Sequence, residues 1–220
     1  MIRRVVRRPF RDLARAEGGI AMAEFALVLP IIITLLAGGI EIANYATVRM
    51  KVSQLALHVA DNAARIGEGS QLQSKRVTEA QIVDLLRGAA LQSGSLDLAT
   101  RGRVVLSSLE PMATPNPTPL RYQIRWQRCF GAEPHTRMYG TQGQTNLTGM
   151  GPAANPIIAM EDSATMFVEL NYRYRPLLLT DVVSFGEFTE IAAMPVRDRR
   201  DRTGGNNGIH PSAGVTASTC

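Results

Sequence analysis

The pattern of apolar and polar residues near the start of the chain predicts a helix that crosses a membrane. Residues 25–40 carry no charge, and extending the run to residues 20–45 adds only Glu24 and Glu41 as charged residues. A helix over residues 20–45 is about 39 Å long at about 1.5 Å per residue. The hydrocarbon core of a bilayer is about 30 Å thick. The run is therefore long enough to span a bilayer with both carboxylates near the two interfaces.

The apolar pattern continues beyond this run as a stripe with helical spacing. Its members recur every three or four residues: Val48, Val52, Leu55, Val59, Ala63 and Ile66. Such spacing is typical of an amphipathic helix with one buried face. We expect one long helix from about Ile20 to Ile66, with residues 20–45 in the membrane and residues 46–66 as its soluble continuation. Gly67 is expected to end this helix, because glycine is common just after a helix C-terminus.

Three residues of the membrane run bear on how this helix packs. Pro30 lacks an N–H group, so neighbouring helices or a local kink must compensate for the missing hydrogen bond. Gly39 and Ala43 are small residues four positions apart, a spacing that lets a second helix approach closely. We therefore expect Pro30, Gly39 and Ala43 to be helix-packing positions.

Residues 67–200 are predicted to form an exported domain of the α+β class. Residues 77–91 have a helical period, with Thr78 as a candidate N-cap. Four later segments have a strand period: 103–109, 120–130, 165–174 and 190–196. Pro195 favours an edge position for the last of them. The fold class is thus a long N-terminal helix plus a second helix packed on a small antiparallel sheet, which covers the stripe of residues 46–66.

The strand at residues 120–130 shows the clearest alternation. Tyr122, Ile124 and Trp126 have one parity and Gln and Arg the other, which predicts a half-buried antiparallel strand.

The segments between these elements receive coarser expectations. The proline-rich residues 111–119 are expected to connect a hairpin, and residues 177–185 to form a short helix or an apolar loop. Residues 131–156 are long, polar and glycine-rich, so we expect them to be mobile or to bind a partner. Residues 201–220 are rich in Gly, Asn, Ser and Thr and are expected to be disordered.

The charge of the chain is concentrated at its N-terminus. Residues 1–19 hold six arginines against Asp12 and Glu17, a net charge of +4 of the total +5. A near-neutral body argues against a nucleic-acid partner, which requires a basic face on the fold. Arginines before a span instead keep the N-terminus in the cytoplasm, so the domain is expected to be exported.

The cysteines and histidines do not form a metal-binding pattern. Cys129 and Cys220 are far apart and outside any CxxC motif, and the three histidines are scattered, so no metal and no cofactor are expected. The two cysteines are either one disulfide of an exported protein or a buried thiol and a free terminal one. The sequence also contains none of the usual nucleotide, hydrolase or metalloprotease motifs. We therefore expect a structural protein rather than an enzyme.

The N-terminal motifs resemble a known family. The matching pieces are Gly18-Gly19, the segment EFALVLP at residues 24–30, the segment GIE at residues 39–41, Tyr45, and the segment ADNAAR at residues 60–65. Together they resemble the TadE-like family of the tight-adherence (Flp) pilus system, and the glycine pair resembles the prepilin peptidase site of type IV pilin-like proteins.

The resemblance implies a pilin-like fold and a role in pilus assembly. A prepilin peptidase would cut between Gly19 and Ile20, which makes residues 1–19 a cytoplasmic leader. The mature protein would stay in the inner membrane as a minor pilin or pseudopilin, in hetero-oligomers with other pilin-like subunits and pilus assembly proteins. Its domain would lie in the periplasm or outside the cell, where it could enter the pilus. The large domain argues against the main fibre subunit.

Glu24 would be the fifth residue after that cut. Cleavage would give Ile20 a free α-ammonium group, and a carboxylate near hydrocarbon needs a positive partner. The new N-terminus of a neighbouring subunit, or of the same chain, supplies one, so Glu24 is interpreted as the carboxylate that sets the register of assembly. The simpler alternative is that Glu24 lies at the cytoplasmic interface with an arginine. Glu41 is expected at the outer interface.

Two other function classes remain open from the sequence. One is a secreted enzyme, released near Gly39 by an ordinary signal peptidase. The other is an uncleaved, single-pass anchor whose exported domain presents residues 131–156 to another envelope protein. Cleavage after Gly19 separates the pilin interpretation from both.

Overall fold

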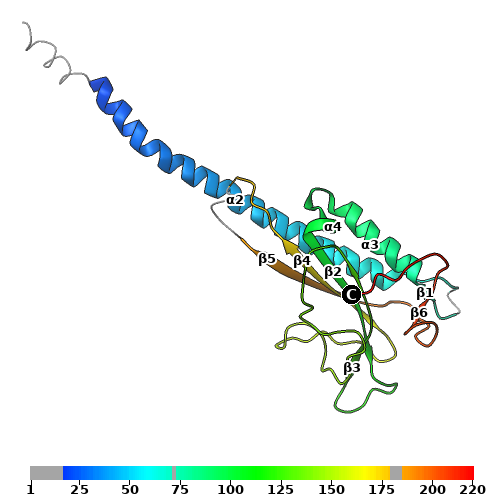
Figure 1. The fold of residues 1–220 in the computed structure, drawn as a ribbon. Helices are drawn as coiled ribbons and strands as arrows, with labels where there is room; N and C mark the ends of the chain where they lie inside the picture. Colours follow the sequence, from blue (N-terminus) through cyan, green and yellow to red (C-terminus); the bar gives the residue numbers. More distant parts are fainter. Residues whose placement is uncertain (1–16, 71–72, 179–184) are drawn as a thin grey trace, which may run out of the picture. The chain divides into compact units, whose positions relative to one another are not determined.

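The computed structural model describes residues 17–70, 73–178 and 185–220 (Figure 1). The arginine-rich leader up to residue 16 and most of the expected helix or loop at residues 177–185 lie outside the described residues. The chain divides into two compact units. The described part of the first unit comprises residues 17–45 and 176–178, and that of the second comprises the other described residues.

Helix α2 (Glu17–Arg65) is the long helix that the sequence predicts. It starts three residues before the expected Ile20 and ends one residue before Ile66. Its part in the first unit exposes apolar side chains in nearly every direction, including Ile20, Phe25, Leu27, Ile33 and Leu36. A helix that is apolar all round needs an apolar environment. From Gly19 onward, α2 is the one helix among the described residues that is long and apolar enough to cross a membrane.

The second unit contains a four-stranded antiparallel sheet with strand order β3-β2-β4-β5. Its strands are β2 (Gly102–Pro111), β3 (Tyr122–Phe130), β4 (Thr165–Arg173) and β5 (Glu187–Pro195). The remaining elements are β1 (Val77–Thr78), α3 (Glu79–Ser93), a 3₁₀ turn (Gly94–Leu96), α4 (Leu98–Arg101) and β6 (Ile209–His210). The α+β class is confirmed. The proline-rich segment connects the β2–β3 hairpin, and β5, which ends at Pro195, is an edge strand.

Helix α3 begins where its sequence predicts. The Thr78 side chain accepts a hydrogen bond from the backbone N–H of Gln81, and the Gln81 side chain accepts one from the N–H of Thr78. This reciprocal capping box satisfies two N–H groups that have no partner within the helix. It fixes the start of α3 beside the second half of α2.

One face of the sheet packs on the two helices, as the stripe on α2 predicts. Figure 1 shows α3 and the second half of α2 on the same side of the sheet. The core there joins Val52, Val59 and Ala63 of α2 to Ile82 of α3 and Leu106 of β2, all less than 3 % exposed. Burial of this face anchors residues 46–65 in the domain.

A bulge in β3 corrects the expected alternation of that strand. Ser108 pairs with Trp126, but the next residue of β2, Leu109, pairs with Ile124, so Arg125 has no partner in β2. An extra residue reverses the faces to which the side chains on its two sides point. Trp126 consequently joins the core beneath the helices, whereas Ile124 joins the core on the opposite face. The expectation that they share one face is wrong.

Residues 131–164 cover this opposite face. Leu147 and Met150 from this segment pack with Tyr122, Ile124 and Phe167 of the sheet. Backbone bridges join Leu147 to Tyr122 and Ile157 to Met150. The segment 131–156, for which the sequence suggests mobility or partner binding, is therefore a covering layer over apolar side chains of β3 and β4.

The C-terminal segment also differs from the expectation of disorder at residues 201–220. Strand β6 pairs with β1 in parallel, and Cys220 forms a disulfide with Cys129. Ile209 is fully buried, and the N–H of Cys129 donates to the carbonyl of Ser218. A polar and glycine-rich composition does not reveal that one apolar residue and one cysteine hold this segment to the domain.

Candidate functional site

The expected cleavage site lies at the N-terminal end of α2. Gly19 and Ile20 are both helical, because α2 begins at Glu17. A side chain added at Gly19 would meet no atom within 4 Å. Ile20 is exposed in the described chain. A protease needs an extended peptide, and a glycine pair lowers the helix propensity of the first turn of α2. The bond is thus accessible and lies in a locally weak part of the helix.

Glu24 lies one helical turn after Ile20. Residues four apart share one face of a helix, so the Glu24 side chain lies over the turn that a free Ile20 amine would occupy. Its side chain is exposed. The carboxylate thus lies one helical turn from the backbone nitrogen of Ile20 in the same chain.

The three expected packing positions lie on the same helix. Pro30 is inside α2, and the Thr34 hydroxyl donates a 2.7 Å hydrogen bond to the Pro30 carbonyl. Side chains added at Gly38 or Gly39 would meet no atom within 4 Å, and Ala43 is exposed. Among the described residues, there is thus open space beside α2 at Gly38 and Gly39.

Glu41 is a residue whose role the sequence did not reveal. Its side chain is fully buried although its helical neighbours Ile40 and Ile42 are exposed. Its carboxylate accepts hydrogen bonds from the backbone N–H groups of Leu177, at 3.0 Å, and Leu178, at 2.9 Å. A carboxylate within an apolar run signals a need for donors, but nothing in the sequence shows that they come from a segment 136 residues away.

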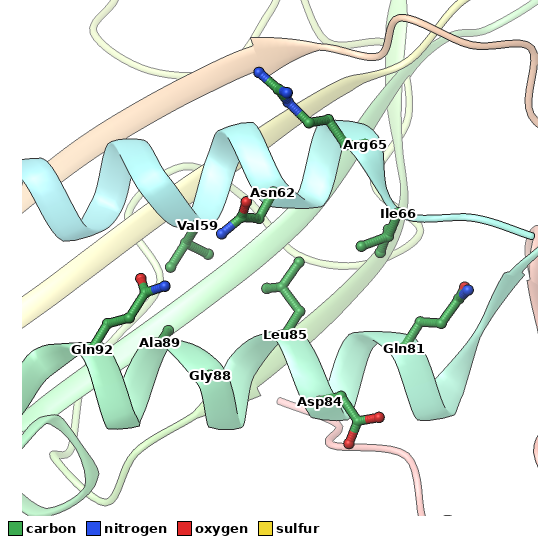
Figure 2. Close-up of a pocket in the computed structure, with 10 residues that line it drawn as sticks. All are labelled: Val59, Asn62, Arg65, Ile66, Gln81, Asp84, Leu85, Gly88, Ala89 and Gln92. Carbon is green, nitrogen blue, oxygen red and sulfur yellow. The ribbon is translucent and has the colours of Figure 1, made fainter.

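A groove runs between α2 and α3 in the second unit. It has a volume of about 440 Å³ and is lined by Val59, Asn62, Arg65, Ile66, Gln81, Asp84, Leu85, Gly88, Ala89 and Gln92. Figure 2 shows Leu85 pointing from α3 toward Val59 and Ile66 of α2, whereas Arg65 and Asp84 point away from the gap. The lining includes no His, Cys, Ser or Thr, so it offers an apolar floor and amide groups rather than a nucleophile with a base.

A buried contact joins the segment after β3 to β4. Nε2 of His135 lies 2.6 Å from Oε1 of Glu169, and the N–H of Met138 donates to the same carboxylate. These contacts hold residues 135–138 on β4. The described residues contain no group of three or more His, Cys, Asp or Glu side chains arranged to hold a metal ion.

Cys129 and Cys220 are brought together, which resolves the alternative left open by the sequence. They form a disulfide that links β3 to the last residue of the chain, and the described residues contain no free cysteine. The candidate site residues thus fall into two groups. The disulfide belongs to the second unit, and Gly19, Ile20, Glu24, Pro30, Gly39 and Ala43 all lie on the first part of α2.

Residues 19–67 match the model of the family described as TadE-like protein. The match covers a little under a quarter of the chain and confirms the resemblance over this segment. Its bounds nearly coincide with those of α2. No curated protein and no solved structure is significantly similar to this chain.

Proposed function

We propose that the protein is a membrane-anchored accessory component of tight-adherence pilus assembly, of the minor pilin or pseudopilin type. The observation that carries this proposal is the coincidence of the TadE-like match with α2. The matched segment is one helix whose first half is apolar and exposed and whose second half forms the core of a domain. A helix with these two halves is suited to hold a folded domain at a membrane surface.

The distribution of charge and the disulfide support an exported domain. The six arginines before α2 favour a cytoplasmic N-terminus and translocation of the domain. Disulfides persist in oxidising compartments such as the bacterial periplasm and are rare in the cytosol. The bond between Cys129 and Cys220 therefore fits a domain on the outer side of the cytoplasmic membrane.

Processing after Gly19 is part of the same proposal. The mature chain would start at Ile20, and its ammonium group would lie one turn from the Glu24 carboxylate. In hydrocarbon this pair is favourable only when both charges meet, so stacking of pilin-like helices in one register would be favoured. Gly39 and Ala43 would let such helices approach closely.

An accessory role fits the domain better than catalysis or a role as main subunit. TadE-like proteins are associated with pili and are not a family of enzymes. The domain adds a sheet covered on both faces, which a fibre of tightly packed short helices would have to accommodate many times. If the protein is an adaptor or an initiating subunit, the fibre has to accommodate this domain only once or a few times.

Deletion of the gene in the host bacterium tests the proposal. We expect loss of surface pili and of surface adhesion, restored by the wild-type chain. Glu24→Ala should not restore pili although the protein reaches the membrane. Glu161→Ala, which removes an exposed carboxylate of the domain, is the matched control and should restore them. Normal piliation of the deletion strain would refute the proposed function.

A further inference from the structure

We propose that residues 176–178, in the connection between β4 and β5, form a second membrane contact that Glu41 holds against the transmembrane helix. The partner of this surface is the hydrocarbon of the outer half of the bilayer. The inference rests on the membrane anchoring proposed above and adds an element that the TadE-like segment does not contain.

The contact between the two segments is direct. The Glu41 carboxylate accepts from the Leu177 N–H with both oxygens, each at 3.0 Å, and from the Leu178 N–H at 2.9 Å. These residues belong to the same compact unit as the first half of α2. Glu41 is 0 % exposed, whereas Leu177 and Leu178 are 61 % and 53 % exposed. The backbone of the connection thus donates to Glu41 while its two leucine side chains are more than half exposed.

The position of Glu41 along α2 places this contact at the membrane boundary. Glu41 follows Glu24 by seventeen positions, or about 26 Å at about 1.5 Å per residue. With Glu24 at the cytoplasmic edge of a hydrocarbon core about 30 Å thick, Glu41 lies just inside the outer edge. The exposed Ile40 and Ile42 on either side of it indicate that lipid surrounds the helix at this depth.

The hydrogen bonds remove two costs that an apolar environment imposes. Non-helical backbone is costly in hydrocarbon because its N–H groups find no water, and a carboxylate is costly there for the same reason. Here the Glu41 carboxylate and the N–H groups of Leu177 and Leu178 are hydrogen-bonded to each other. Isolated exposed leucines on a loop would be ordinary, but these two lie directly beside a carboxylate of the membrane-spanning helix. The tie to Glu41, rather than the exposure alone, therefore points to insertion.

The residue before the contact suits the membrane surface. Arg175 is exposed and immediately precedes Pro176. A long arginine side chain at the edge of the hydrocarbon can place its charge among lipid phosphates while its stem lies on apolar surface. The order Arg175, Pro176, Leu177, Leu178 thus runs from a basic group to apolar ones, as expected for a segment entering a bilayer.

Fluorescent labelling of single cysteines tests the insertion. The full chain, with its disulfide retained, carries an environment-sensitive NBD label at Leu178→Cys, at Ile33→Cys in the span, or at Leu91→Cys, an exposed position on α3. Each protein is reconstituted into phosphatidylethanolamine–phosphatidylglycerol vesicles with or without acyl-chain bromination. We expect brominated lipid to quench the labels at 178 and 33 at least twofold and to leave the label at 91 unchanged.

Removal of the carboxylate tests the role of Glu41. Glu41→Ala should lower quenching at position 178 toward the value at 91 while quenching at 33 persists, and Glu161→Ala should change neither. A label at 178 that behaves like the one at 91 would overturn the inference, and so would a label that is shielded from water but not quenched by lipid, because protein would then cover it. If, in the chain that retains Glu41, brominated lipid quenches neither the label at 178 nor the label at 33, the membrane anchoring itself is wrong.

Discussion

The guanidinium of Arg128 on β3 and the carboxylate of Glu79, the first residue of α3, form a buried ion pair. Nε of Arg128 donates to Oε2 of Glu79 at 2.9 Å, and Nη2 donates to Oε1. Both side chains are less than 10 % exposed. Two parallel hydrogen bonds from a guanidinium to a carboxylate fix the relative orientation of the two groups as well as their distance. It therefore sets the position of α3, one wall of the groove, relative to the sheet.

Glu79→Ala is expected to destabilise the domain by about 3–5 kcal/mol, because it leaves the Arg128 guanidinium buried without its counter-charge. Thermal and urea unfolding of the full chain in detergent measures this effect. The double variant Glu79→Leu with Arg128→Met should recover most of the loss, since it removes both charges. Arg49→Ala is the matched control: it breaks the pair with Glu190, in which the arginine is more than half exposed, and should cost less than about 1 kcal/mol. Equal losses from both single variants would contradict this account.

The disulfide is expected to contribute about 2–5 kcal/mol, because it closes a long loop between residues 91 positions apart in the unfolded chain. The double variant Cys129→Ser with Cys220→Ser should unfold at lower urea concentration than the wild type. A reducing agent should lower the stability of the wild type and leave that of the double variant unchanged. If the wild type unfolds identically with and without reductant, the bond does not stabilise the fold.

The burial of Glu110 is expected to make the stability of the domain depend on pH. Burial raises the pKa of the Glu110 carboxyl above its ordinary 4.5, although a hydrogen bond from Ser108 and the charges of Arg125, Arg202 and Arg200 oppose the rise. An acid with a raised folded-state pKa favours the protonated folded form. This residue therefore lowers stability as pH rises from 4.5 through the folded-state value.

Glu110→Gln should consequently be more stable than the wild type at pH 7, and the difference should shrink toward zero at about pH 4. Melting temperatures of the two proteins at both pH values measure it. A variant that is less stable than the wild type at pH 7 would mean that attraction to the three arginines outweighs the cost of burial.

The elements that the sequence predicted well are those with a strong local signal. The stripe from Val48 to Ile66 depends on residues three or four apart, and the N-cap at Thr78 depends on the first turn that follows it; both formed as expected. The Arg125 bulge did not follow from the alternation, because one unpaired residue reverses which face Trp126 uses without altering the residue types. Burial on both faces of the sheet also removes the polar side on which that interpretation relied.

The contacts that sequence reasoning missed join segments far apart in the chain. Arg200 donates from Nη2 to the carbonyls of Ala63 and Ile66 at the end of α2, and burial lowers its pKa to about 10, so it remains charged at neutral pH. In the sequence this arginine lies among other arginines and aspartates, a composition typical of a solvated segment. In the first unit, Glu41 likewise has its hydrogen-bond donors far away in the sequence, at Leu177 and Leu178. A charged residue signals that it needs a partner, but only the fold shows where the partner is.

The measurement that tests the central claim most directly is the N-terminal mass of the membrane-associated protein, expressed with and without a prepilin peptidase. We predict a chain that starts at Ile20 only when the peptidase is present, and an uncut chain when Gly19 is replaced by a bulky residue. An intact Met1 in the presence of the peptidase would contradict the pseudopilin proposal and leave an uncleaved anchor. A soluble chain that starts near Ile40 would show that the apolar run is an ordinary secretory signal.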